Sequence, residues 1–212
     1  MANEKQNVLI AGANGTTGRI IVDLLKDSDV YHPIAMLRKK KQKEHFEQNN
    51  VKVVIADLVE DLSHAVKNVD CVIFAAGSQG KNVVDVDQDG AKRLTDAAKK
   101  AGVKKFVMLS SMGADNPPEK SDLKDYLKAK QNADLYLQAS GLDYSIVRPG
   151  ALTDEDGTGM IQLNPKIDAN GSIPRADVAK TLIAVLAHDV MKNQTFEILS
   201  GDTPIATSVT PK

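Results

Sequence analysis

The sequence contains no tryptophan, and aromatic residues make up only 4% of its 212 residues. Proteins that bind single-stranded nucleic acid by stacking use exposed aromatic side chains, so this composition argues against that class. The formal net charge is −1, which gives no overall attraction to nucleic acid or to an anionic membrane. We therefore expect neither of these partners.

Cysteine and long apolar runs are also scarce. Cys71 is the only cysteine, so no disulfide can form within the chain, and its apolar neighbours at 72–75 indicate a buried thiol. No apolar run approaches the roughly 20 residues of a membrane span, and the first six residues lack the apolar stretch of a signal peptide. The histidines at 32, 45, 64 and 188 do not have the spacing of metal ligands. We expect a cytoplasmic protein without a metal site.

Short apolar runs alternate with longer amphipathic segments along the whole chain. This alternation is typical of parallel strands joined by crossover helices. It predicts an α/β fold of the Rossmann type, with a doubly wound parallel sheet of strand order 3-2-1-4-5-6 and a possible seventh strand at 195–199. The expected strands are 7–11, 32–37, 51–56, 71–76, 105–110 and 144–148, and the expected helices are 18–26, 82–101, 122–140 and 178–188.

The length of the chain suits one sizeable core better than two full domains, so we expect a single domain over 1–212. Residues 151–175 contain Gly, Asp, Asn and Pro without clear periodicity. We expect them to form a small, loop-rich lobe on the substrate side, with 200–212 as a tail. The basic stretch 38–43 is expected to be a turn after the second strand.

The first strand runs directly into Gly12-Ala13-Asn14-Gly15-Thr16-Thr17-Gly18, and a helix follows. In this context Gly12 permits a tight turn, Gly15 lets the backbone approach a pyrophosphate, and Gly18 lets helix and strand pack closely. Free N–H groups and the helix dipole then face the phosphates, and the hydroxyls of Thr16 and Thr17 add donors. The alternative is an ordinary strand-to-helix turn. We predict that this segment, Asn14 included, binds a dinucleotide.

The glycines are spaced G-x-x-G-x-x-G, and six further short motifs follow them in order: Asp57-Leu58, Ala75-Ala76-Gly77, Leu109-Ser110-Ser111, Tyr126 to Lys130, Val147 to Gly150 and Ile173 to Ala179. Each later motif is modest alone, and their order and spacing together cover nearly the whole chain. With them the sequence resembles the short-chain dehydrogenase/reductase superfamily, specifically its atypical, NmrA-like branch.

The residues after the second strand favour NADP(H) over NAD(H). An acid at this point would accept a ribose hydroxyl of NAD, whereas an arginine would hold the additional phosphate of NADP. The sequence has Arg38 followed by three lysines, and a guanidinium group suits a phosphate well. A solvated basic turn is the alternative.

The resemblance implies further cofactor contacts. Asp57 and Leu58 would contact the adenine, and the small residues Ala75, Ala76 and Gly77 would let the dinucleotide lie close over the fourth strand. The alternative use of these small residues is helix packing. The same resemblance implies that Ser110, Lys130 and Pro149 contact the cofactor.

Tyr126 and Lys130 are four residues apart in an expected helix, so their side chains lie on one face. The resemblance implies a catalytic Ser, Tyr-x-x-x-Lys arrangement in which Lys130 holds the nicotinamide ribose and Tyr126 exchanges a proton with a carbonyl oxygen. Ser110 or Ser111 would bind the same oxygen, and Ser111 is favoured. A Tyr and a Lys at this spacing also occur by chance on amphipathic helices. The superfamily often adds an asparagine after the fourth strand, and residues 83–90 contain none.

We expect an NADP(H)-dependent oxidoreductase that acts on a small carbonyl, quinone or flavin-like substrate, as a monomer or homodimer. An NADP(H)-sensing regulatory protein with little turnover is the alternative. A sugar epimerase or dehydratase is a third reading, although roughly 60 residues after Gly150 leave little room for a large substrate lobe.

Overall fold

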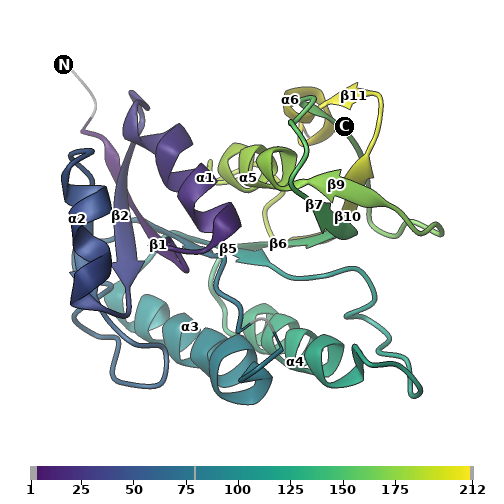
Figure 1. The fold of residues 1–212 in the computed structure, drawn as a ribbon, viewed down its shortest axis with the longest axis horizontal. Coiled ribbons are helices and arrows are strands. Elements are labelled where there is room, and N and C mark those ends of the chain that lie inside the picture. The colour runs from purple at the N-terminus through teal and green to yellow at the C-terminus, as the bar shows by residue number, and fades with distance from the viewer. Residues whose placement is uncertain (1–3, 79, 211–212) are drawn as a thin grey trace.

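The computed structural model describes residues 4–78 and 80–210, so residues 1–3 of the predicted domain and 211–212 of the predicted tail lie outside it. A nine-stranded sheet is covered by α1 and α5 on one face and by α3 and α4 on the other (Figure 1). The strands of this sheet are β1 Gln6–Ala11, β2 Tyr31–Leu37, β3 Lys52–Ile55, β4 Cys71–Phe74, β5 Lys105–Leu109, β6 Tyr144–Pro149, β8 Met160–Asn164, β10 Gln194–Ser200 and β11 Thr203–Pro204. The main helices are α1 Thr16–Lys26, α3 Asp89–Ala101, α4 Lys124–Ala139 and α5 Arg175–Ala184.

The predicted Rossmann-type sheet is confirmed. Strands β3-β2-β1-β4-β5-β6 are parallel and stand in the predicted order, and β10 adds the seventh parallel strand. Strand β8 then pairs antiparallel with β10, and β11 pairs antiparallel with β8. The chain order reverses between β1 and β4, which is where such sheets bind their ligands.

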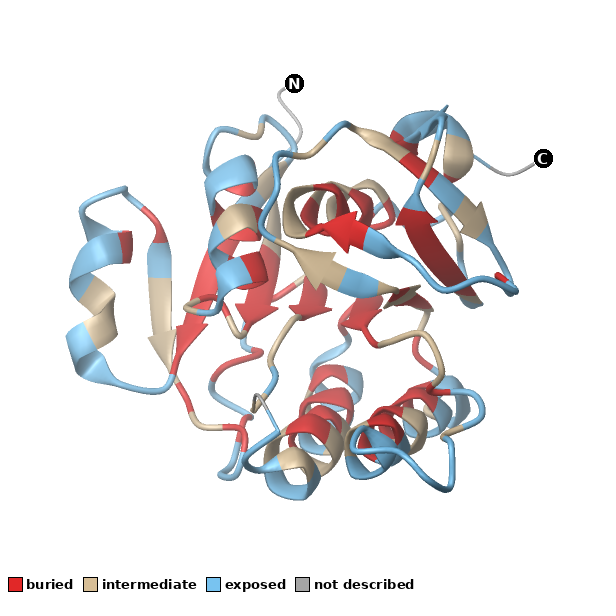
Figure 2. Ribbon diagram, turned by 45° about the vertical axis from the view of Figure 1, so that its right-hand side comes forward, coloured by how far each residue is buried: buried red, intermediate tan, exposed pale blue. Residues whose placement is uncertain are grey.

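Alternating side chains of each strand build two separate cores. Val8 and Ile10 of β1 pack in the cluster that contains α1 and α5, whereas Leu9 and Ala11 pack in the cluster under α3 and α4. A strand buried on both faces therefore needs a continuous apolar run, and Figure 2 shows the central strands buried along their length. This is why the apolar runs located the strands from the sequence.

The largest differences between the observed and the predicted helices lie at three places. The basic stretch expected as a turn forms a short 3-10 helix η1 Lys40–Gln42 and the helix α2 Lys43–Glu47, because Phe46 is buried against the sheet. The helix expected at 82–101 begins as a π-helix, η2 Val83–Gln88, before α3. The last long helix begins at Arg175 instead of 178, directly after Pro174, and ends at Ala184.

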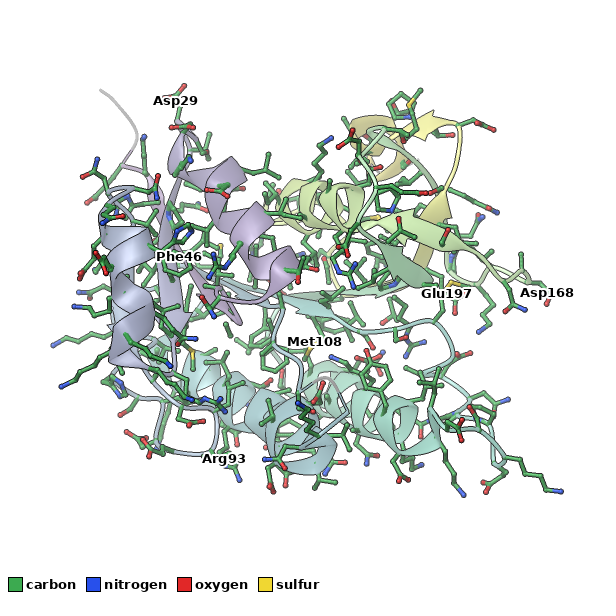
Figure 3. All side chains as sticks on the ribbon, viewed as in Figure 1. Asp29, Phe46, Arg93, Met108, Asp168 and Glu197 are labelled. Carbon is green, nitrogen blue, oxygen red and sulfur yellow. The ribbon has the colours of Figure 1, made fainter. Side chains whose placement is uncertain are left out.

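The segment 151–175 is more regular than predicted. It contains β8, and it also contains β7 Ala151–Thr153 and β9 Ser172–Pro174, which pair in a second, two-stranded sheet. Buried acids hold this lobe: Asp177 accepts hydrogen bonds from the N–H groups of Thr158 and Gly159, both at 2.8 Å. Glu197 accepts one from the N–H of Ile167 at 2.7 Å (Figure 3). Hydrogen bonds from single acids to backbone N–H groups produce no periodic pattern of apolar residues, so the sequence does not reveal this order.

None of the helices within residues 4–78 and 80–210 has the length and apolar character that crossing a membrane requires.

Lys105 is an unusual core residue. It begins β5, is fully buried, and its Nζ donates a hydrogen bond to the carbonyl oxygen of Val190 at 3.1 Å. Burial lowers the pKa of Lys105 to about 8, against the opposing influence of Asp143. The charged lysine is therefore less favourable in the folded protein than in the unfolded chain.

We predict that the folded state becomes more stable relative to a Lys105→Met variant as pH rises. Between about pH 8 and pH 10.5 the unfolded chain binds more protons at this residue than the folded protein, so its free energy of unfolding rises with pH. Chemical denaturation at pH 7 and pH 10 measures the free energy of unfolding of wild type and of the variant. From pH 7 to pH 10, the value for wild type should rise by about 2 kcal/mol relative to that of the variant. The exposed Lys99→Met is the control, and an equal shift in it would contradict the prediction.

Candidate cofactor and active site

In the glycine turn between β1 and α1, backbone segments pack directly against one another. Gly12 has a φ of +88°, and a Cβ on it would lie 2.6 Å from the Cα of Ala76, just beyond β4. A Cβ on Gly18 would overlap the carbonyl oxygen of Gly12, and one on Gly15 would come within 3.2 Å of the same oxygen. The turn therefore keeps a side-chain-free surface between the ends of β1 and β4, as a dinucleotide requires.

Helix α1 presents its amino end at this turn. Gly15 is the N-cap residue, no side chain within the described residues caps the helix, and its first turn contains no acid. The N–H groups of the first turn and the positive end of the helix dipole are thus available to an anion. Thr16 is exposed there, whereas Thr17 is buried. Asn14 is held in place by Arg19, whose Nη2 donates to its Oδ1 at 2.7 Å.

Arg38 lies at the same edge of the sheet. It follows β2, which runs parallel to β1 in a register that pairs Met36 with Ala11, and its side chain is exposed. Asp57, in the connection that follows the adjacent strand β3, is half-buried and accepts a hydrogen bond from the N–H of Val59 at 3.3 Å. Arg38 is therefore free to meet a ligand, while the Asp57 carboxylate stabilises its own turn.

Leu58 and the residues after β4 line the next part of this edge. Leu58 is buried, and its carbonyl oxygen accepts a hydrogen bond at 3.2 Å from Arg93 of α3, which is labelled in Figure 3. Ala75 and Ala76 are half-buried and Gly77 is exposed. The predicted small residues thus lie at the carboxyl end of β4, beside the glycine turn.

The two serines after β5 have different surroundings. Ser110 is buried and donates its hydroxyl to Oδ2 of Asp134 at 2.8 Å. Ser111 is half-buried, and within the described part of the chain its hydroxyl donates only to the carbonyl oxygen of the following residue, Met112, at 3.2 Å. Ser110 therefore ties β5 to α4, and Ser111 is the one that remains accessible to a ligand.

The structure brings Tyr126 and Lys130 together on α4. The Nζ of Lys130 lies 5.7 Å from the centre of the Tyr126 ring and 3.2 Å from the carbonyl oxygen of Leu109, at the end of β5. Tyr126 is half-buried, but the Lys130 side chain is only 4% exposed. The pair therefore lies at the predicted edge of the sheet, with the lysine beneath the surface and the tyrosine at it.

Two buried acids near this pair were absent from the sequence prediction. Asp134, one turn after Lys130, accepts a hydrogen bond from Nε of Arg148 at 3.0 Å and forms an ion pair with its Nη2 at 2.9 Å. Burial raises the pKa of the Asp134 carboxyl, although Arg148 and Ser110 oppose this effect. Asp87, the second acid, lies in η2 and faces Lys130 at 3.7 Å. The spacing of Lys130 and Asp134 on one helix face could have suggested Asp134, but no sequence pattern pointed to Asp87.

Pro149 is also buried, at the carboxyl end of β6. Its carbonyl oxygen accepts a hydrogen bond from the N–H of Met112 at 2.9 Å, which holds the segment after Ser111 against β6. The predicted residues from Gly12 to Pro149 thus gather along the carboxyl edge of one sheet.

Comparison with known proteins shows which family this chain belongs to. A family model described as NAD(P)H-binding matches residues 12–189. The chain belongs to this NAD(P)H-binding family. The predicted resemblance to the atypical short-chain dehydrogenase/reductase group is confirmed, and the family is one of NAD(P)H-binding oxidoreductases.

Three relatives of the family show how far the likeness extends. The uncharacterized sugar epimerase YhfK of Bacillus subtilis (strain 168) is 42% identical, over 94% of this chain and 96% of its own. A solved structure of a putative NAD-dependent epimerase/dehydratase from Bacillus halodurans is 38% identical, with a TM-score of 0.91 over 96% of this chain and 98% of the other. Sanguinarine reductase of Eschscholzia californica is 27% identical over 93% of this chain and 90% of its own.

We predict that Gly18→Ala abolishes binding of NADPH and NADH, because the added methyl group forces α1 away from Gly12. Overpacking of this kind also costs about 1–3 kcal/mol of stability. Titration calorimetry and thermal unfolding measure the two effects. Gly102→Ala is the control: Gly102 has a φ of +73° but nothing within 4 Å of an added Cβ, so this variant should lose stability alone. Normal cofactor affinity in Gly18→Ala would contradict the prediction.

Proposed function

We propose that the protein is an NADP(H)-dependent reductase of a small carbonyl, quinone or flavin-like substrate. The observation that supports it most is the shared edge of the sheet. There the glycine turn and Arg38 stand at the ends of β1 and β2, and Ser111, Tyr126 and Lys130 stand at the end of β5. A cofactor laid along this edge with its adenosine over β2 would have its nicotinamide near β5.

Arg38 supports NADP(H) as the cofactor. Its exposed guanidinium can form paired hydrogen bonds with a phosphate, and Lys39, Lys40 and Lys41 add positive charge beside it. The acid that would select NAD is missing after β2, and Asp57 is occupied by the N–H of Val59. The α1 amino end and the Thr16 hydroxyl would hold the pyrophosphate.

We predict that Arg38→Ala weakens NADPH binding roughly 10- to 100-fold, because a hydrogen bond to a charged group contributes about 1.5–3 kcal/mol. NADH affinity should change less than about twofold, since NADH lacks the additional phosphate. Titration calorimetry with both cofactors makes the comparison. Lys52→Ala is the control, because Lys52 has the same charge and is exposed but begins β3, at the opposite edge of the sheet. Equal losses for NADPH and NADH in Arg38→Ala would overturn the phosphate argument.

The chain's own residues can handle the substrate oxygen. When bound, the nicotinamide supplies or accepts a hydride. The accessible Ser111 hydroxyl can donate a hydrogen bond to the substrate oxygen, and the Tyr126 phenol can give that oxygen a proton. Lys130 lies close enough to the Tyr126 ring for its positive charge to stabilise negative charge that develops on the phenol.

We predict that Tyr126→Phe lowers kcat at least about 100-fold, the usual scale for loss of a general acid, and changes NADPH affinity little. Steady-state NADPH oxidation with a panel of quinones, aldehydes and flavins measures the effect. Tyr136→Phe on the same helix is the matched control, because the Tyr136 hydroxyl binds Asp96 on the outside of the protein. If Tyr126→Phe retains the full rate, the proton-transfer role is wrong and Ser111 alone must orient the substrate.

The burial of Lys130 favours a second candidate, an NADP(H)-sensing protein with little turnover. Both polar partners of its ammonium, Asp87 and the Leu109 carbonyl, lie inside the protein. A sensor would bind NADPH tightly and oxidise none of the panel. The epimerase names of two relatives define a third outcome, in which sugar nucleotides are converted without net NADPH consumption.

A further inference from the structure

Segment η2 buries an aspartate although it also contains three valines. It contains Val83, Val84 and Val86 together with two aspartates, yet Asp87 is the one residue of η2 that is buried, at 1% exposure, while Val84 is 53% exposed. Burial of a carboxylate is unfavourable, and so is the exposure of a valine that could have been buried in its place. A π-helical turn is also uncommon and often occurs at functional sites. The arrangement therefore indicates that Asp87 has a specific role in the site.

The two oxygens of Asp87 face two different parts of the candidate site. Oδ2 accepts a hydrogen bond from the N–H of Ser78 at 3.0 Å, in the segment that follows β4. Oδ1 lies 3.7 Å from Nζ of Lys130 and has no hydrogen-bond partner among the described residues. A Cβ on Gly77 would be 3.4 Å from the same Oδ1. One carboxylate thus links the end of β4, where the cofactor would lie, to the ammonium beside Tyr126.

Lys130 depends on this carboxylate. A buried ammonium without an opposite charge is strongly unfavourable, and Asp87 is the acid that forms an ion pair with it. The Leu109 carbonyl oxygen, at 3.2 Å, holds the ammonium from the β5 side. Together the two acceptors fix Nζ between the ends of β4 and β5.

We propose that Asp87 is a positioning residue of the active site. Its carboxylate holds the Lys130 ammonium beside Tyr126. It also fixes the position of this ammonium relative to the Gly77–Ser78 backbone, over which the cofactor would lie. This inference rests on the proposed reductase function. It adds a residue that acts through Lys130 and does not itself contact substrate.

A double-mutant cycle of Asp87→Asn and Lys130→Met tests the proposal. Asparagine keeps an oxygen for the Ser78 N–H and removes only the negative charge that faces Lys130. For all four proteins, kcat, KM for NADPH, NADPH affinity and thermal unfolding are measured. Asp85→Asn is the matched control, because Asp85 is an exposed acid of the same segment.

We expect Asp87→Asn to lower kcat about tenfold in the wild-type background and less than about twofold when Lys130 is already methionine. KM for NADPH should change less than about threefold, because the backbone turn is preserved. The control should stay within about twofold of the wild-type rate. Such a coupled loss supports positioning through Lys130, since a purely structural effect of Asp87 would persist in both backgrounds.

An equal loss in both backgrounds, or no loss in the wild-type background, overturns the proposal. If wild type binds NADPH but reduces none of the panel, the reductase function fails, and the same cycle applied to NADPH affinity decides the role of Asp87. If wild type binds no NADPH, both proposals fall. If Asp87→Asn does not fold, Asp87→Glu replaces it in the cycle, because it keeps the charge and displaces it by one methylene group.

Discussion

The contact between the Gly12 backbone and Ala76 is the constraint on which the rest of the site depends. It brings the end of β1 against the end of β4, at the point where the strand order reverses. The overlap that a Cβ on Gly18 would make with the Gly12 carbonyl oxygen shows that α1 starts as close to this turn as a backbone can. Since α1 then covers β1 and β2, the same contact sets the direction of its dipole toward the sheet edge.

A second constraint is the set of buried charges between α4 and the sheet. Asp87 faces Lys130, and Asp134 faces Arg148, so two acids balance two bases whose side chains are at most 11% exposed. Each pair bridges different elements, which makes the position of α4 sensitive to all four groups. Ser110 is drawn into this set by Asp134, and the neighbouring Ser111 is consequently the hydroxyl that faces outward.

The sequence allowed the sheet to be predicted because its strands are apolar on both faces, and the glycine turn could be located because its spacing follows a strand. The lobe after β6 could not be predicted in the same way. Its order comes from Asp177 and Glu197, single buried acids that bind backbone N–H groups and create no period. Asp87 was missed for a related reason: an aspartate among valines is expected to face solvent, and only the π-helical turn reverses that expectation.

The position of Lys130 bears on how any chemistry here could work. Its ammonium donates to the Leu109 carbonyl oxygen and faces the Asp87 carboxylate, and its side chain is only 4% exposed, so burial restricts direct contact with a ligand. Its charge needs no direct contact to act on Tyr126, whose ring centre is 5.7 Å away. In a poorly hydrated region an interaction between charges at that distance remains substantial. For the proposed reductase, the geometry thus favours a lysine that acts electrostatically, with Tyr126 and Ser111 as the groups that would contact the substrate.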